Sequence, residues 1–105
     1  MGRLKVHGGD FARGRAWFSP RVGFLLRNMN GERESILVEN LVVAYDATEG
    51  AIRKLGGDDL LVDEFGRVPA SDKAGQHLFV VSFNDGRLLL ASASPRSYRE
   101  IRAKR

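Results

Sequence analysis

The stretch that decides the fold is HLFVVSFNDGRLLLASASPRSYREI, residues 77–101. Two apolar runs flank Asp85-Gly86, a dipeptide typical of two-residue type I′ hairpin turns. Such a turn pairs Phe83 with Leu88, whereas a turn that includes Asn84 shifts the register by one residue. Three apolar side chains of the first run share one side of the strand and are expected to face the core: Phe79, Val81 and Phe83. Residues 77–93 therefore predict a β-hairpin.

A C-terminal helix over about residues 95–104 is expected directly after this hairpin. Ser94 is a suitable N-cap, because its side chain accepts a hydrogen bond from the first turn, and Pro95 suits the first helical position. Tyr98 and Ile101 lie three residues apart and give the helix one apolar edge. We expect this edge to pack on the core.

Further strands are expected upstream of the hairpin. Apolar alternation and β-forming residues mark five stretches: residues 3–7, 15–18, 21–28, 34–45 and 60–65. Asn30-Gly31 is typical of a hairpin turn, and Glu39-Asn40 indicates a bend or bulge inside the fourth stretch. Trp17 and Phe18 are adjacent, so one points inward and the other outward. The chain thus predicts about seven strands, with residues 66–76 as a loop.

A short internal helix is expected near residues 46–56. Asp46 and Glu49 fit a capping box, in which the first side chain caps the helix and the second reaches back to it. Three apolar residues share one face of this helix: Ala51, Ile52 and Leu55. Gly56-Gly57 supplies the end of the helix.

Seven strands followed by one helix resemble the pleckstrin-homology (PH) superfold. GRAWFSP (14–20), ESILVENLVVAYDATE (34–49) and FVVSFNDGRLLLASASPRSYREI (79–101) are similar in order to small bacterial PH-like and GRAM-like domains. The resemblance implies one mainly β (α+β) domain over residues 1–105. Its fold would be a two-sheet β-sandwich or partly open barrel with a C-terminal capping helix. The acidic stretch 56–75 departs from the apolar segment of some relatives, and the internal helix is no part of the simplest PH plan.

Basic residues collect at the two ends of the sequence. Residues 1–27 hold six basic residues against one acidic, and residues 96–105 hold five against one. The centre holds six basic and eleven acidic residues, and the formal net charge is +4. Basic ends around an acidic centre favour an anionic partner. Charged side chains also simply solvate a protein surface, so both interpretations stay open.

The candidate binding segment is HGGDFARGRAW, residues 7–17. Headgroup-binding PH domains often carry one basic residue on the first strand and a basic-x-basic pair on the second, and Lys5, Arg13 and Arg15 have this spacing. Strand alternation puts Arg13 and Arg15 on one side, where Lys5 of the partner strand joins them, and glycine amides between the strands suit phosphate. Arg21 is an outlying fourth candidate. A solvated basic hairpin is the alternative.

The sequence contains no recognisable catalytic or metal-binding pattern. Gly9 and Gly14 have P-loop spacing, but Arg15 and Ala16 stand where that motif needs Lys and Ser or Thr. The chain has no cysteine, which excludes disulfides and thiolate ligands. Neither His7 with Asp10 nor the acidic residues 58–64 match a metal-ligand spacing. We therefore expect a protein that is not an enzyme and needs neither metal nor cofactor.

The expected function is that of a non-catalytic binding module. Its partner would be another protein, a second copy of the chain, or an anionic ligand or surface such as a lipid headgroup. The alternative is a basic nucleic-acid-binding protein in which Trp17 or Tyr98 stacks on bases, although the aromatic RNA-binding signature is lacking. No apolar run approaches the ~20 residues of a membrane helix. The N-terminus lacks a signal-peptide core, so a cytoplasmic protein is expected.

Overall fold

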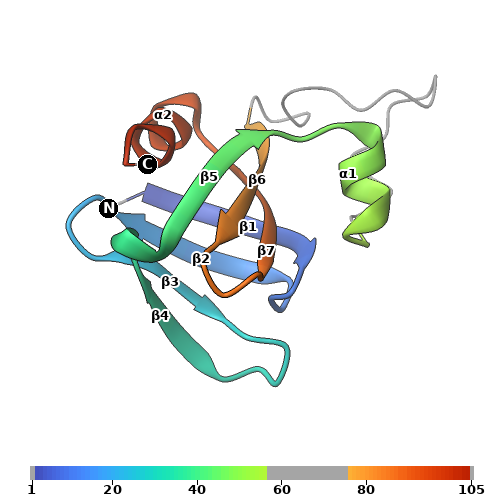
Figure 1. Cartoon of the computed structure of the whole chain (residues 1–105), viewed down its shortest axis with the longest axis horizontal. Coiled ribbons are helices and arrows are strands. Elements are labelled where there is room, and N and C mark those ends of the chain that lie inside the picture. Colours follow the sequence, from blue (N-terminus) through green and yellow to red (C-terminus); the bar gives the residue numbers. More distant parts are fainter. Residues whose placement is uncertain (1, 57–75, 105) are drawn as a thin grey trace.

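The computed structural model describes residues 2–56 and 76–104, and within them seven strands and two α-helices follow one another along the chain (Figure 1). The strands are β1 (Gly2–Gly9), β2 (Gly14–Ser19), β3 (Gly23–Arg27), β4 (Arg33–Leu37), β5 (Leu41–Asp46), β6 (His77–Phe83) and β7 (Leu88–Ala93). The helices are α1 (Glu49–Lys54) and α2 (Pro95–Ala103), and a 3-10 turn, η1, spans Val38–Asn40. The strand predicted at residues 60–65, the acidic residues 58–64 and most of the loop that follows lie outside the described residues.

The seven strands form one antiparallel sheet in the order β4-β3-β2-β1-β7-β6-β5. This sheet curls so that β5 and β6 cross in front of β1 and β2, and α2 lies against β5, β6 and β7 (Figure 1). The expected mainly β fold is therefore confirmed: a partly open barrel of about seven strands, a C-terminal helix and a short internal helix. Its hydrogen bonding is that of one curled sheet rather than of two separate sheets.

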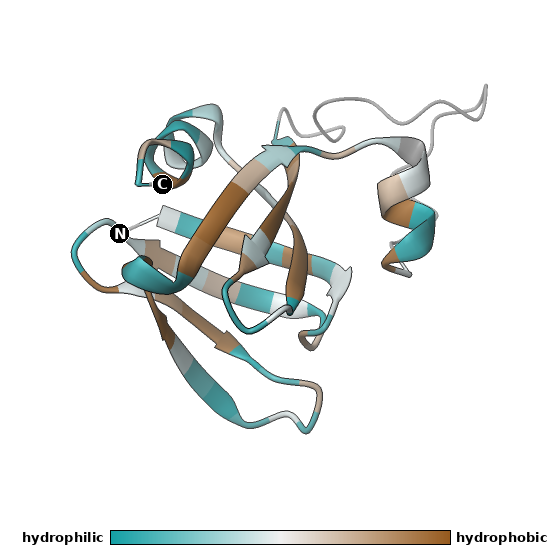
Figure 2. Cartoon of the chain, viewed as in Figure 1, coloured by the Kyte–Doolittle hydropathy of each residue, from teal (hydrophilic) through white to brown (hydrophobic). Residues whose placement is uncertain are grey.

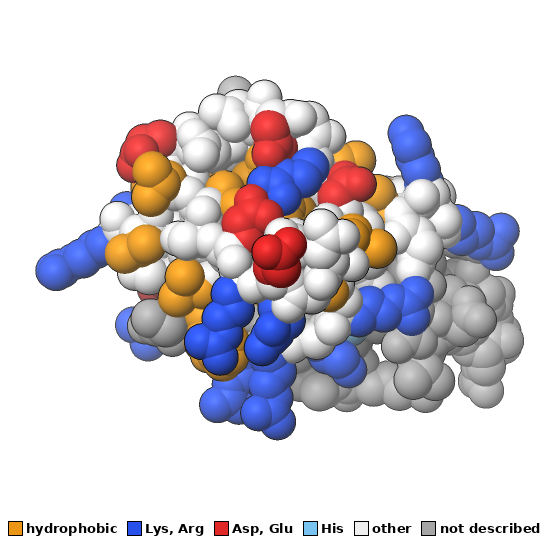
Figure 3. Space-filling model, turned by 90° about the horizontal axis from the view of Figure 1, so that it is seen from below, with side chains coloured by type: hydrophobic (Ala, Val, Ile, Leu, Met, Phe, Trp, Pro, Cys, Tyr) orange, Lys and Arg blue, Asp and Glu red, His pale blue; other side chains and the backbone are white. Residues whose placement is uncertain are grey.

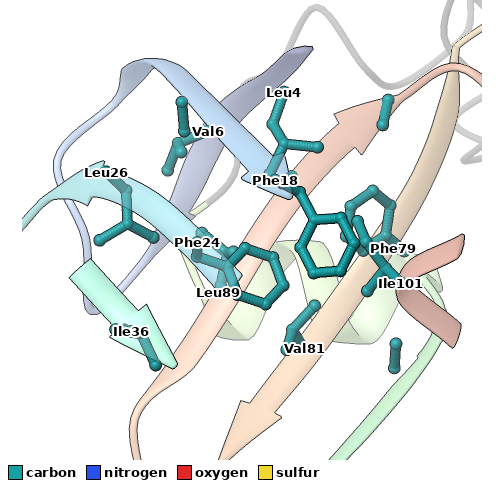
Figure 4. Packing of buried hydrophobic residues seen from close by; sticks show 14 of the residues in the cluster. Leu4, Val6, Phe18, Phe24, Leu26, Ile36, Phe79, Val81, Leu89 and Ile101 are labelled. Atoms are coloured by element: carbon teal, nitrogen blue, oxygen red, sulfur yellow. The ribbon is translucent and has the colours of Figure 1, made fainter. Parts of the chain in front are cut away.

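The main core fills the concave side of this sheet. Side chains from β1 to β4, from β6 and β7 and from α2 converge there (Figure 4). Phe83 is central, because the rings of Phe24 and Phe11 pack edge-on against it with centroids 5.3 and 5.6 Å away. The expectation that Phe79, Val81 and Phe83 share the core side of β6 is confirmed. Phe18 points into this core, so its neighbour Trp17 points outward.

The opposite side of β6 and β7 is also buried. Ile52 of α1 packs there against Leu78, Val80 and Leu90, and Figure 2 shows long hydrophobic segments on β6 and β7 beside a hydrophilic turn. The predicted apolar face of α1 is thus confirmed, but the predicted cap is wrong. Thr48 caps the helix by accepting a hydrogen bond from the Ala51 amide at 3.3 Å.

Asp46 does not cap α1 because it is still the last residue of β5. Its carboxylate pairs with the His77 side chain at the start of β6 instead. The C-terminal helix agrees with the sequence in detail. Ser94 accepts a hydrogen bond from the Ser97 amide at 3.2 Å, Pro95 begins the helix, and Tyr98 and Ile101 are buried.

The β6–β7 turn contains three residues rather than two. Phe83 and Gly86 are joined by a turn hydrogen bond, the Phe83 amide donates to the Arg87 carbonyl, and Ser82 pairs with Leu88. The type I′ turn is therefore wrong, because it needs a positive φ at Asp85 and only Gly86 has one, at 90°. Asn84 belongs to the turn, and the register is the shifted one.

The turn between β3 and β4 has the same form. The Gly31 amide donates to the Asn28 carbonyl at 2.9 Å, and Gly31 has a φ of 80°. Glu39-Asn40, by contrast, is more than a bend within one strand. Both residues lie in η1, which takes the chain from β4 at one edge of the sheet to β5 at the other.

Candidate anion-binding face

The outer side of β1 to β4 carries most of the basic side chains of the N-terminal half. Lys5 on β1 pairs in register with Arg15 on β2, and Arg27 on β3 pairs with Arg33 on β4. All four side chains are exposed. Like charges placed directly opposite each other on neighbouring strands repel and destabilise a sheet. We call the outward side chains of these strands the basic face: Arg3, Lys5, Arg15, Trp17, Leu25, Arg27, Arg33 and Ser35.

Within the described part of the chain, no carboxylate forms an ion pair with these cations. Three of the acidic groups close to β4 and β7 are engaged elsewhere, whereas Glu32, in the turn before β4, is exposed. Glu34 and Asp85 both bind Arg87, and Asp10 accepts a hydrogen bond from the Leu88 amide at 2.8 Å. Arg27 donates only to the Gly31 carbonyl of its own turn, at 2.9 Å. The positive charge of the basic face is therefore not neutralised by the described residues.

A groove of about 700 Å³ lies on this face. Four arginines and two apolar side chains contribute to its lining: Arg13, Arg15, Arg27, Arg33, Trp17 and Leu25. In Figure 3, Lys and Arg side chains crowd the lower part of the visible surface, beside exposed hydrophobic side chains. Glu34 also borders the groove, and its carboxylate binds Arg87. The groove thus combines four positive charges and one paired carboxylate with one exposed indole ring.

A second hollow of about 670 Å³ continues the face past β1. Arg3, Lys5 and Arg15 border it together with Ser92, Ser94 and Ser97. The serine hydroxyl groups are engaged within the protein, that of Ser92 with His7 and those of Ser94 and Ser97 with each other. Arg15 borders both hollows, so it lies at the centre of the basic face. Guanidinium and ammonium groups are donors suited to phosphate or carboxylate oxygens.

The structure brings Lys5 and Arg15 together as the sequence predicts, but it places the other two candidates differently. Arg13 precedes β2, so strand alternation does not determine the direction of its side chain. Its guanidinium donates to the Gly56 carbonyl, and the residue also borders the groove. Arg21 lies in the turn after the far end of β2. From Arg15 to this turn the chain runs for six residues, on the order of 20 Å in an extended strand.

Three amides of the glycine-rich segment are bound within the protein and are not free for a phosphate. The Gly9 amide donates to the Leu55 carbonyl at 2.9 Å, and the Asp10 amide donates to the Leu88 carbonyl at 2.8 Å. The Ala12 amide is likewise bound to the Arg27 carbonyl, at 3.0 Å. The expectation of a phosphate-holding loop at these amides is therefore wrong, because they bind the protein's own carbonyl groups.

His7 and Asp10 also have separate structural roles. The His7 side chain is buried, and its Nε2 lies 2.8 Å from the Ser92 hydroxyl oxygen. Asp10 turns to the Leu88 amide instead. Among residues 2–56 and 76–104, no group of three acidic, His or Cys side chains is placed to hold a metal ion.

Arg87 is the one arginine of this region that is clearly bound by acids. It contacts Glu34 through both terminal nitrogens and Asp85 through Nε, and its guanidinium lies 4.9 Å from the centre of the Phe11 ring. The hydrogen bonds from Arg87 lower the pKa of Glu34 and of Asp85, and in turn raise the pKa of Arg87. These interactions tie the β6–β7 turn to β4 and exclude Arg87 from the basic face.

A second polar cluster lies beside α2. The ring of His77 stacks on that of Tyr98 with centroids 4.0 Å apart, and His77 also pairs with Asp46. Among the described residues the buried Tyr98 hydroxyl has no partner within hydrogen-bond geometry, although Asp46 and Arg102 lie close enough to influence it. Burial, followed by the nearby Asp46 carboxylate, raises the pKa of Tyr98. The cluster joins β5, β6 and α2, so its role is structural.

Sequence reasoning missed Arg27 and Arg33. The signal was present, because Asn30-Gly31 predicts a hairpin turn and places the flanking strands opposite each other.

Comparison with known proteins finds no matching family model, no matching curated protein and no matching solved structure. Among the described residues, no helix has the length and apolar character needed to cross a membrane.

Proposed function

We propose that this chain is a non-catalytic binding module that recognises an anionic partner through the basic face. The observation that carries the proposal is that the members of two like-charged pairs lie opposite each other in the strand register, Lys5 with Arg15 and Arg27 with Arg33. Such pairs oppose folding, and an anion that lies between them removes the repulsion. The two hollows give this anion a place to bind.

We also propose a PH-like architecture for the module. The sequence resemblance supports it, since seven strands precede one C-terminal helix in both. The curled sheet with α2 packed against β5, β6 and β7 is consistent with the same proposal. Of the three ligand-contacting residues that the resemblance implies, Lys5 and Arg15 lie opposite each other on the basic face, and Arg13 borders the groove.

Salt-dependent binding to heparin, a flexible polyanion, tests the proposed function. The wild-type protein is expected to bind a heparin column and to elute at raised salt, because each displaced counterion contributes to binding. A variant with Lys5→Gln and Arg15→Gln is expected to elute at clearly lower salt. Arg21→Gln removes one charge from a distant turn and serves as a control with little expected effect. Elution of the double variant together with the wild type would refute the proposal.

Self-association is a second candidate function, favoured by one feature of β5. This strand is an edge of the sheet and exposes the side chains of Val42 and Tyr45, which are 45% and 42% accessible. An edge strand with apolar side chains is suited to pair with another strand. Light scattering on the purified protein tests it: a mass of twice 11.6 kDa supports a dimer, and a monomer at high concentration contradicts it.

A further inference from the structure

Trp17 is the unusual residue of the basic face. It lies in the middle of β2, where Arg3 on β1 and Leu25 on β3 are its neighbours in register. Its side chain is 39% exposed, and among the described residues no other ring stacks on it and no cation lies over it. An indole ring normally buries a large apolar area. This one presents an unoccupied aromatic surface in the lining of the groove.

The cations around Trp17 are arranged along the groove and not scattered over the molecule. Arg15 lies two positions before Trp17 on the same side of β2, and Arg27 and Arg33 line the same groove. Neighbouring strands lie about 4.8 Å apart, and alternate residues of a strand about 7 Å apart. These spacings place the backbones of several cationic residues within about 7–12 Å of that of Trp17. Such a combination of cations and one stacking surface suits a chain of phosphates with attached aromatic bases.

Resting on the proposed function, we infer that the partner is a single-stranded nucleic acid, whose phosphates bind Lys5, Arg15, Arg27 and Arg33 while a base stacks on Trp17. A duplex fits less well, because its bases are already stacked on one another and are not available to the indole. A lipid headgroup supplies negative charge but no planar ring. A second copy of this chain would bring the same positive face and would be repelled.

Fluorescence titration gives a direct readout, because Trp17 is the single tryptophan of the chain. The probe is an oligothymidylate of about 20 nucleotides, which exceeds the roughly 4–16 nucleotides that one small single-strand-binding domain covers. Stacking is expected to change the Trp17 emission as the anisotropy of a labelled strand rises. An abasic strand of the same length retains the phosphates but lacks the bases. It is expected to bind more weakly and to leave the emission nearly unchanged.

Three variants separate stacking from charge. Trp17→Leu is expected to weaken binding of the oligonucleotide about 5- to 150-fold, the usual contribution of one stacked base, with little change in the salt dependence. Trp17→Phe keeps an aromatic ring and is expected to weaken binding less than Trp17→Leu does. Lys5→Gln with Arg15→Gln is expected to reduce the slope of log K against log salt by about 1.4, since each lost phosphate contact contributes about 0.7. Arg21→Gln is the matched control.

Heparin and vesicles that contain phosphatidylserine distinguish binding of single-stranded nucleic acid from binding of anions in general. Binding to either one without binding to the oligonucleotide would overturn the nucleic-acid inference and leave the anion-binding proposal in place. No salt-sensitive binding to any of the three probes would overturn both. Equal binding of the oligonucleotide and the abasic strand, with no effect of Trp17→Leu, would also overturn the inference, because the bases would then contribute nothing.

Discussion

The amide of Gly9 donates a hydrogen bond to the carbonyl oxygen of Leu55 at 2.9 Å, and this contact fixes the end of α1 on β1. The neighbouring Gly8 allows the close approach. A β-carbon added at Gly8 would stand 2.5 Å from the same Leu55 oxygen. Gly9, which has P-loop spacing with Gly14, and its neighbour Gly8 therefore form the docking site of a helix, which covers the outer side of β6 and β7.

The first prediction concerns this docking site. Gly8→Ala is expected to destabilise the protein by about 1–3 kcal/mol, because the new methyl group meets a backbone carbonyl that cannot rotate away. Urea unfolding followed by circular dichroism measures the change. A free energy of unfolding equal to that of the wild type would contradict the close packing of α1 on β1.

Gly50 provides the second prediction and a matched control within α1. A β-carbon at Gly50 meets nothing within 4 Å, and the residue lies in the helix. Gly50→Ala is expected to stabilise the protein by about 0.5–1 kcal/mol, because alanine loses less backbone entropy than glycine in a helix. The same unfolding measurement tests it. A loss of stability would show that α1 does not form in solution.

The third prediction concerns the pH dependence of the Glu34–Arg87 ion pair. The hydrogen bonds from Arg87 hold the pKa of Glu34 below its ordinary value of 4.5. A lowered pKa means that the pair stabilises the fold above pH 4.5 and that this stability is lost as the pH falls through the folded-state pKa. Glu34→Gln is expected to cost about 1 kcal/mol near neutral pH, since the pair is only partly buried.

Urea unfolding of the wild type and of Glu34→Gln at a series of pH values tests this dependence. The difference between the two proteins is expected to be constant near neutral pH and to shrink below pH 4.5. Glu32→Gln, in the exposed turn before β4, is a control that changes the same charge. A difference that persists unchanged in acid would show that the Glu34 carboxylate is not bound to Arg87.

The fourth prediction concerns the buried hydroxyl group of Tyr98. Because that oxygen has no hydrogen-bond partner among the described residues, Tyr98→Phe is expected to leave the free energy of unfolding unchanged or to raise it by about 1 kcal/mol. Burial also raises the pKa of Tyr98 above 10.0, so the wild type is expected to lose stability relative to the variant as the pH rises past that value. Unfolding measured at neutral and alkaline pH checks both parts. A loss of more than about 1 kcal/mol on substitution would indicate a partner for the hydroxyl.

Local patterns in the sequence were sufficient for most of the described elements and for the core-facing sides of β6 and α2. The alternation Phe79, Val81, Phe83 identified the core side of β6, and Ser94-Pro95 identified the start of α2. Each of these signals depends on neighbouring residues alone. The same holds for the pairing of Lys5 with Arg15, which needs only two adjacent strands and a short connection.

The register of the β6–β7 hairpin could not be predicted, because both sides of β7 are apolar. Leu88, Leu89 and Leu90 follow one another, so a shift by one residue exchanges one leucine for another on each side. The deciding contact is long-range: α1 covers the outer side and buries Leu90 there. The extent of the basic face was missed for a different reason: its signal was local, because Asn30-Gly31 predicts the turn that brings Arg33 opposite Arg27, but the two arginines were not paired across it.

The last prediction uses the repulsion between Lys5 and Arg15. Lys5→Glu converts a like-charged pair into an oppositely charged pair across the strands, so it is expected to stabilise the fold by about 0.2–1 kcal/mol. The gain is expected to be largest at low ionic strength, because salt screens exposed charges. Urea unfolding at low and high salt measures it. The same substitution is expected to weaken heparin binding, which would indicate that the wild-type sequence retains a destabilising pair because the pair binds an anion.

A double-mutant cycle isolates this contact from other effects of the substitution. Lys5→Gln removes the repulsion without adding an attraction, so it is expected to give only part of the gain. In an Arg15→Gln background, Lys5→Glu is expected to lose most of its benefit, because its partner charge is gone. If Lys5→Glu raised the free energy of unfolding equally in both backgrounds, Lys5 would respond to the overall charge of the basic face and not to Arg15. The Lys5–Arg15 pair would then not be evidence for the proposed site.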